Sequence, residues 1–179
     1  FLGFRDHVAR SLKDPAHAAR IAKAFETVRE FTAPEERWPE REVSQFSDCV
    51  VVSYRTVDRS AVFDLLLNIL LLQIQLVGRG FIVRGGITEG LLYHRNNVVF
   101  GPAMVEAHRL ESEDAIYPRI LVDPELIDVA RDYPGIHHSG NDEVRYVEEF
   151  LGKDVDGKRY LKYVGWDAVV ECAGADSED

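Results

Sequence analysis

The sequence predicts an α+β fold, an α/β sandwich in which helices pack on a mixed sheet. Helical spacing of apolar residues alternates along the chain with short runs rich in Val, Ile and Tyr. Gly and Pro residues separate these runs, as they do between helices and strands. With 179 residues, one domain can bury a core without disulfide bonds. We therefore expect a single domain over residues 1–172, followed by a frayed acidic tail at 173–179.

The first third of the chain is expected to form a strand, a helix and a hairpin. Residues 1–4 resemble the end of a strand that turns into a helix. Apolar residues recur every three or four positions over 15–32, which predicts a helix. A proline-containing loop follows, and residues 42–54 are then expected to form a hairpin that turns at Ser47 and Asp48.

The middle third is expected to hold two helices around two strands. A helix over 59–78 has Asp58 or Ser60 as its cap and ends at a Gly-Arg-Gly sequence. Strands are expected at 81–93 and 97–100. Proline at the favoured first helical position predicts a further helix over 102–112.

The last third is expected to end in a second hairpin. A strand at 119–122 and a helix at 124–131 come first, and a loop follows at 133–143. The closing hairpin covers 144–164 and turns at an Asp-Gly pair, which is a strong turn signal.

Charge and cysteine content limit the class of protein. The net charge is −10, with 31 acidic against 21 basic residues, whereas a surface that binds nucleic acid is normally basic. We therefore expect no nucleic-acid partner, although acidic residues that hold metal ions suit a nucleotide substrate. Cys49 and Cys172 do not form a disulfide framework, and no signal peptide is visible. These features predict a cytoplasmic protein.

The apolar run at 61–78 is long enough to cross a membrane. The placement of its polar residues distinguishes a membrane span from a buried helix. On a helical wheel they fall mainly in one narrow stripe. An apolar surface over the rest of the helix circumference is typical of a helix that is buried in a protein. We expect it to pack against a sheet or a partner subunit and not to span a membrane.

Three short sequences carry a family resemblance: FSDC at 46–49, RGGITEG at 84–90 and FGPAMVEAHRLE at 100–111. Their order along the chain is similar to that of the class III nucleotide cyclases. The residues in these three segments are most similar to those of the pyrimidine cyclases of the bacterial Pycsar anti-phage systems. The resemblance implies a ferredoxin-like βαββαβ core with a mixed sheet and a C-terminal β-hairpin.

In that family an acidic residue at a hairpin binds catalytic metal, and Asp48 occupies this position. The resemblance implies two Mg²⁺ or Mn²⁺ ions per site, held by Asp48, by a backbone carbonyl of Phe1 and by a second aspartate. Phe1, Leu2, Gly3 and Phe4 match the last four positions of the motif that carries the second aspartate, which would directly precede Phe1. Their backbone would bind the phosphates of the substrate. An ordinary turn aspartate is the alternative for Asp48.

The family also places a catalytic arginine on the helix over 102–112. Arg109 has this position, one helical turn after Val105. The family has an asparagine where this chain has Val105, so the role of orienting the ribose is not matched. A surface ion pair between Arg109 and Glu106 is the alternative.

Ser44 and Val98 occupy the positions where adenylate cyclases read adenine with a lysine and an aspartate. A hydroxyl and an apolar group do not reproduce that readout. The departure fits a pyrimidine cyclase, and it also fits a catalytically degenerate domain. Three basic residues of the closing hairpin, Lys158, Arg159 and Lys162, are equal candidates for a phosphate contact.

Together these matches predict a cyclase that converts UTP, or less favourably CTP, to the 3′,5′-cyclic monophosphate and pyrophosphate. The resemblance further implies a head-to-tail homodimer and a separate effector that the cyclic nucleotide activates in phage defence. Two alternatives stay open at this point. They are a degenerate nucleotide-binding domain on the same fold and a purine cyclase with a rearranged base pocket.

Overall fold

The structure is a computed structural model that describes residues 1–34 and 36–164. It combines helices and short strands with a mixed sheet, which confirms the α+β class. Cys172 and the tail at 173–179 lie outside the described residues, so the expectations about them stay predictions.

Six α-helices and one π-helical turn form most of the regular structure in the described ranges. They are α1 (Phe4–Ser11), α2 (Pro15–Phe31), α3 (Ala61–Gly78), α4 (Pro102–Arg109), the π-helical turn Leu110–Asp114, α5 (Leu126–Asp132) and α6 (Gly140–Glu149). The strands are β1 (Glu42–Phe46), β2 (Cys49–Ser53), β3 (Gly85–Ile87), β4 (Tyr93–Arg95), β5 (Val98–Phe100), β6 (Ile120–Val122), β7 (Leu151–Lys153) and β8 (Arg159–Leu161).

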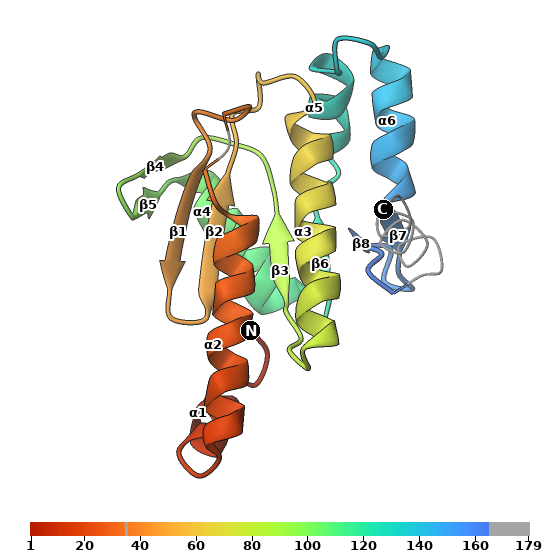
Figure 1. Cartoon of the computed structure of the whole chain (residues 1–179). Coiled ribbons are helices and arrows are strands. Elements are labelled where there is room, and N and C mark those ends of the chain that lie inside the picture. Colours follow the sequence, from red (N-terminus) through yellow and green to blue (C-terminus); the bar gives the residue numbers. More distant parts are fainter. Residues whose placement is uncertain (35, 165–179) are drawn as a thin grey trace, which may run out of the picture.

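The strands form one four-stranded sheet and two hairpins. The four-stranded sheet has the order β3-β6-β8-β7, with β3 and β6 parallel and the other pairs antiparallel. β1 and β2 form one antiparallel hairpin, and β4 and β5 form the other. Figure 1 shows β2 and β3 with their arrows in the same direction, and the segment at the N-terminus lies near the lower ends of both.

The long helix α3 is the centre of the core. It packs on β3 and β6 through Leu66 and Leu70, and its other end meets α2 in a second cluster around Phe81. Leu66 and Leu76 are almost completely buried. By length and composition α3 could also cross a membrane, which is weak evidence because the core helix of a soluble protein passes the same test.

α4 covers the opposite face of β3 from α3. The side chains of consecutive strand residues point to opposite faces, and Ile87 belongs to the cluster around α3. Gly86 therefore faces α4, where an added Cβ atom would lie 2.5 Å from the Cβ atom of Leu110 and 2.7 Å from the carbonyl oxygen of Ala107. Glycine is needed here because the helix packs directly on the backbone of the strand.

Two strand predictions are wrong in extent. Phe1–Phe4 is not a strand: Gly3 has φ +66° and Phe4 begins α1, although the amide of Leu2 donates to the carbonyl of Ile82 at 2.8 Å. The expected strand at 81–93 is reduced to β3, which ends at Ile87, and the chain then turns at Gly90, where φ is +141°. Tyr93 then starts the separate β4–β5 hairpin, whose turn has two asparagines with positive φ.

The first arm of the predicted closing hairpin is also wrong, because residues 140–149 form α6. Ser139 and Asp142 make a capping box, in which each side chain accepts a hydrogen bond from the backbone amide of the other residue. Val147 is then buried against α3 and α5. The apolar residues at 144, 147 and 150 have helical spacing, which outweighs their β-propensity. Only the second half of this region, β7 and β8, forms the hairpin.

Candidate functional site

Asp48 lies at the tip of the β1–β2 hairpin, in a two-residue turn where Ser47 has φ 56°. The backbone nitrogen of Phe1 donates to the carbonyl oxygen of Asp48 at 3.0 Å and lies 3.8 Å from its Oδ2 atom. The Asp48 side chain is 36% exposed, so its carboxylate is open to a ligand. The structure thus brings together Asp48 and the segment that the sequence predicts to bind phosphate.

The Phe1 side chain is turned away from a ligand at this site, which leaves its backbone to make the contact. The Phe1 side chain is 4% exposed and its ring contacts Phe4, Phe25 and Phe81 with centroid distances of 5.4–6.2 Å. Gly3, with φ +66° and open space around its Cα atom, precedes the first turn of α1. The backbone of Gly3 is therefore accessible beside the start of a helix, which carries partial positive charge.

Ser44 does lie next to the segment that contains Val98, but its hydroxyl is already occupied. Ser44 is 1% exposed, and its Oγ atom is 2.9 Å from His94 Nε2 and 3.3 Å from Asn97 Oδ1. Val98, by contrast, is 52% exposed on β5. Of the two predicted base-binding positions, Val98 can touch a ligand directly, and Ser44 acts on that region through His94 and Asn97.

His94 links three strands in a way that the sequence did not reveal. It is 7% exposed, and its ring nitrogens lie 2.9 Å from Ser44 Oγ on β1 and 2.8 Å from Ser53 Oγ on β2. Burial lowers the pKa of His94, and the nearby carboxylate of Glu42 opposes this shift without reversing it. This shift favours the uncharged imidazole, in which one ring nitrogen donates a hydrogen bond and the other accepts one.

His94 is expected to make the fold less stable below neutral pH. The pKa of His94 is lower in the folded chain than in the unfolded chain, where it has the ordinary histidine value of 6.5. As the pH falls below 6.5, the unfolded chain therefore binds a proton at His94 before the folded chain does. Its contribution to stability is complete above that pH and is lost as the pH falls through the folded pKa. His17, whose pKa burial also lowers, acts in the same direction.

The measurement is the free energy of unfolding by urea between pH 7.5 and 5.5. His94→Gln is expected to cost about 1–3 kcal/mol at pH 7.5, because it disturbs two buried hydrogen bonds, and to flatten the pH dependence. The exposed His137 provides the control, His137→Gln, which should keep both the stability and the slope. A slope that is the same in His94→Gln and wild type would contradict this assignment.

Arg109 ends α4 in a set of ion pairs. Its Nε and Nη2 atoms donate to both oxygens of Glu106 at 2.9 and 2.7 Å, and its Nη1 atom donates to Asp114 at 2.8 Å. The pair with Glu106 is the alternative that the sequence left open. These hydrogen bonds raise the pKa of Arg109 and lower those of the two carboxyl groups. Arg109 is still 41% exposed.

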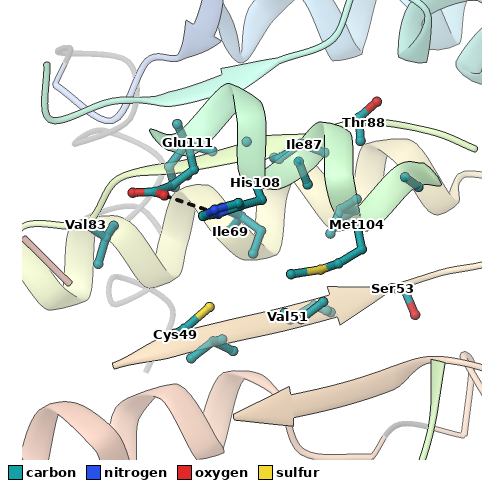
Figure 2. Close-up of a pocket in the computed structure, with 18 of the residues that line it drawn as sticks. Cys49, Val51, Ser53, Ile69, Val83, Ile87, Thr88, Met104, His108 and Glu111 are labelled. Atoms are coloured by element: carbon teal, nitrogen blue, oxygen red, sulfur yellow. Dashed lines mark ion pairs between the residues drawn. The ribbon is translucent and has the colours of Figure 1, made fainter. Parts of the chain in front are cut away.

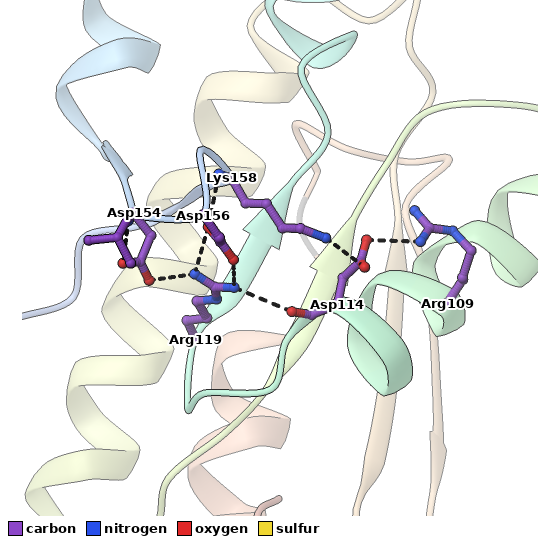
Figure 3. Close-up of polar contacts among 7 residues, drawn as sticks. Arg109, Asp114, Arg119, Asp154, Asp156 and Lys158 are labelled. Atoms are coloured by element: carbon purple, nitrogen blue, oxygen red, sulfur yellow. Dashed lines mark hydrogen bonds and ion pairs between the residues drawn. The ribbon is translucent and has the colours of Figure 1, made fainter.

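Asp114 connects Arg109 to the closing hairpin. Lys158 Nζ lies 2.6 Å from the second oxygen of Asp114, as Figure 3 shows. Arg159 instead pairs with Glu148 at 3.4 Å, on α6. Among the three basic residues that the sequence could not separate, Lys158 is thus the one beside Arg109.

Arg119 is the buried neighbour of this group. Its side chain is 4% exposed, and its guanidinium donates to Asp154 and Asp156 in the β7–β8 turn and to the carbonyl oxygen of Asp114. The Asp156 contact is the largest cause of its raised pKa. A buried charge is stable only with such partners, so Arg119 fixes the turn that presents Lys158.

A cavity of about 680 Å³ lies between β2 and β3, with α3 on one side and α4 on the other. Figure 2 shows Cys49 and Val51 on β2, Ile69 on α3, and Met104 and His108 on α4 around it. Asp48 and Phe1–Gly3 lie at one end of the cavity. Arg109 is not among its lining residues, so one copy of the chain does not combine Asp48 and Arg109 in this cavity.

The side chains that could hold metal ions beside Asp48 are few. Within residues 1–34 and 36–164 no group of three His, Cys, Asp or Glu side chains has the geometry of a metal site. Burial raises the pKa of the Cys49 thiol next to Asp48, and a protonated thiol is a poor ligand. Asp48 fits an oxygen ligand for Mg²⁺ or Mn²⁺. Glu89 and Glu111 also line the cavity, and Glu111 is already paired with Arg84 at 2.7 Å.

The structure therefore joins Asp48 with Phe1–Gly3, Ser44 with the β4–β5 hairpin, and Arg109 with Lys158. Neither Arg109 nor Lys158 is among the residues that line the cavity beside Asp48. No model of a protein family, no curated protein and no solved structure matches the chain.

Proposed function

We propose that the chain is the catalytic domain of a nucleotide cyclase of the class III type, acting on a pyrimidine nucleoside triphosphate. UTP is the favoured substrate and CTP the second. The observation that carries this proposal is the contact between Asp48 and the backbone at Phe1, beside Gly3 and the start of α1. A carboxylate next to free backbone groups at a helix N-terminus suits a metal-bound triphosphate.

In this reaction the ribose 3′-hydroxyl releases its proton to water and its oxygen bonds to the α-phosphorus. The bond from the α-phosphorus to the oxygen that bridges it to the β-phosphorus breaks, and pyrophosphate leaves. Asp48 and a backbone carbonyl of Phe1 would hold Mg²⁺ or Mn²⁺, together with a second aspartate directly before Phe1. The ions would lower the negative charge on the phosphates. The amide groups around Gly3 would orient the phosphate oxygens, so most of the rate enhancement comes from positioning and electrostatics.

Arg109 and Lys158 form the second part of the proposed site. Both bind the same carboxylate, Asp114, so their charges lie side by side on one surface. A triphosphate carries several negative charges and can compete with Asp114 and Glu106 for these two cations. In this role Arg109 stabilises charge on the α-phosphate, and Lys158 binds the phosphates beyond it.

A head-to-tail homodimer would bring the two parts together. Five large apolar side chains on and around β4, β5 and α4 are exposed, namely Leu91, Tyr93, Val98, Phe100 and Val105. A surface of this kind is typical of a protein–protein interface. In a two-fold dimer, Arg109 and Lys158 of one copy can face Asp48 of the other, which would give two equivalent sites.

The remaining implications of the resemblance belong to the same proposal. The ferredoxin-like core would have β2 and β3 on either side of a first strand that ends at Phe1. The enzyme would act in the cytoplasm in phage defence, and its cyclic nucleotide would activate a separate effector.

A nucleotide-binding domain without catalysis is the second candidate function. The double ion pairing of Arg109 favours it, because a catalytic arginine must leave Glu106 and Asp114 to reach a phosphate. The hydrophobic Val105 favours it as well, since it cannot orient a ribose through a hydrogen bond.

Incubation with each of the four nucleoside triphosphates and Mn²⁺ tests the proposed function. The full-length protein is expected to cyclise UTP, with a preference over ATP of about 10²-fold in kcat/KM, since the exposed Val98 offers no polar group to adenine. Chromatography of the products measures the preference. Binding of a triphosphate without any cyclic product would favour the second candidate, and equal turnover of ATP and UTP would contradict the pyrimidine assignment.

A further inference from the structure

The turn between α1 and α2 brings two histidines together. The Asp14 side chain accepts a hydrogen bond from the backbone amide of His17 at 3.2 Å and so caps α2. Figure 1 shows α1 and the first part of α2 beyond the lower ends of the strands. His17 is 4% exposed, and its Nε2 atom lies 3.0 Å from Nδ1 of His7. The two ring planes are parallel to within 2°.

Arg20 fixes the direction of this hydrogen bond. Its Nη2 atom lies 2.6 Å from Nδ1 of His17, and a guanidinium group can only donate. Nδ1 of His17 is therefore an acceptor, and the hydrogen of the uncharged ring lies on Nε2. Burial lowers the pKa of His17, and the positive charge of Arg20 adds to this shift, so the uncharged ring is favoured.

The same reasoning assigns the hydrogen of His7. Since Nε2 of His17 donates, Nδ1 of His7 accepts, and the hydrogen of an uncharged His7 ring lies on Nε2. Within the described residues the bond to His17 is the one hydrogen bond of the His7 side chain. The His7 ring also lies against the buried ring of Phe81, with the centroids 4.7 Å apart. His7 is thus held in place and keeps one N–H donor for a ligand.

His7 lines a hollow of about 250 Å³ on the surface of α1. The residues around this hollow are Gly3, Asp6, His7, Arg10 and His17. Gly3, His7 and Arg10 have helical spacing and lie on one side of α1. Arg10 is exposed, and its Nε atom is 3.7 Å from Asp14, so its guanidinium can turn to a ligand. A cation and a neutral N–H donor therefore lie together.

The charges around the hollow select the kind of ligand. The exposed carboxylate of Asp6 opposes the charge of Arg10, so an anion with a single charge gains little there. A phosphate group carries more charge and several acceptor oxygens, so it can bond to the guanidinium and the imidazole at once. A metal ion needs a free lone pair on a ring nitrogen, and neither nitrogen of His7 offers one in this arrangement.

Gly3 connects the hollow to the proposed catalytic site. It lines both the hollow and the end of the larger cavity where Asp48 lies. A triphosphate that meets a metal ion at Asp48 and the backbone at Gly3 can therefore continue along α1. Its terminal phosphate would then reach the hollow.

We propose that His7 and Arg10 bind the terminal phosphate of the nucleoside triphosphate. Nε2–H of His7 donates to a phosphate oxygen, and Arg10 neutralises part of the charge. His17 and Arg20 are positioning residues, because they keep the hydrogen of His7 on Nε2. The choice of a nucleotide as the ligand rests on the proposed cyclase function, whereas the preference for a phosphate group rests on the hollow itself.

¹⁵N NMR of the histidine rings at pH 8, with sodium pyrophosphate as the probe, tests this proposal without an activity measurement. The shifts of the ring nitrogens report which nitrogen carries the hydrogen. Without the probe, His7 and His17 are both expected in the Nε2–H form. Pyrophosphate should move the Nε2 resonance of His7 and leave the exposed His137 unchanged. Sodium chloride at the same ionic strength should move neither.

Two substitutions in the hollow are expected to weaken pyrophosphate binding. Arg10→Gln should raise the Kd about fivefold. Its matched control is Arg5→Gln, because Arg5 is exposed on the same helix but does not line the hollow, and the Kd should change less than about twofold. His7→Phe keeps a ring against Phe81 and should raise the Kd about tenfold. Asp6→Asn removes the opposing charge and should lower the Kd about two- to threefold.

Substitution of the exposed Arg20 tests the positioning role separately from the fold. In Arg20→Met nothing prevents a hydrogen on Nδ1 of His17, so the ring-nitrogen shifts of His7 and His17 should move toward the average of the two tautomers. In Arg20→Lys the ammonium group again only donates, so these shifts should stay close to those of the wild type.

Hydrogen on Nδ1 of His7 in the chain without the probe would overturn the proposal. So would an Nε2 resonance of His7 that saturating pyrophosphate does not move, or an equal loss of binding in Arg10→Gln and Arg5→Gln. A chain that binds pyrophosphate at His7 but forms no cyclic nucleotide would contradict the proposed function alone. A chain that cyclises UTP while His7 ignores pyrophosphate would contradict the present proposal alone.

Discussion

Asp48→Asn is expected to lower kcat for nucleotide cyclisation by at least about 10³-fold, because a metal ion contributes several kcal/mol to the stabilisation of transition-state charge. The amide of asparagine has nearly the shape of the carboxylate but no charge to hold a divalent ion. Since the Asp48 side chain is 36% exposed at a hairpin tip, its removal should leave the free energy of unfolding within about 0.5 kcal/mol of wild type.

The assay measures nucleotide cyclisation by the full-length protein at saturating Mn²⁺, and urea unfolding is followed in the same samples. Asp132→Asn is a matched control, because Asp132 is an exposed carboxylate at the end of α5. It should keep wild-type turnover. Cyclase activity retained in Asp48→Asn would refute the metal-ligand assignment, and Asp48 would then be an ordinary turn residue.

Local sequence signals predicted much of the secondary structure. The helix at 15–32 and the hairpin at 42–54 appear almost as expected, because apolar periodicity and turn residues lie within the segments themselves. α6 was missed although Ser139 and Asp142 form a recognisable capping box. Its alternating apolar residues suited a strand as well, and the packing on α3 and α5 decided the outcome.

The candidate site was predictable only where its residues are close in sequence or match a motif. Asp48 and Phe1 were expected to lie close together because both match motif positions of the resembled family, and the two residues are in contact. His94 and Arg119 were missed because their environment comes from distant segments. His94 meets Ser44 across 50 positions, and Arg119 meets Asp156 across 37. Burial of a polar side chain depends on such contacts, and no local pattern reports them.

Arg109→Ala is expected to lower kcat by about 10²–10³-fold and to change KM much less, because its proposed contact strengthens as charge develops on the phosphate. Glu106→Gln is the matched control on the same helix. It removes one carboxylate that holds Arg109 in the substrate-free chain, so it should retain activity. A loss that appears in KM alone would contradict a catalytic role, and a loss of the fold would show as a lower unfolding midpoint.

Mixing the two inactive variants tests whether Asp48 and Arg109 act in the same site from different subunits. Arg109 lies outside the cavity that Asp48 lines, so a single copy of the chain does not combine them there. In a head-to-tail heterodimer of Asp48→Asn and Arg109→Ala chains, one site carries both substitutions and the other carries neither. With random exchange half of the dimers are of this kind, so about one quarter of wild-type activity per subunit should return.

Mass spectrometry of differently sized chains verifies the exchange. No recovery after verified exchange would mean that each chain uses its own Asp48 and Arg109, and the shared-site dimer would be wrong.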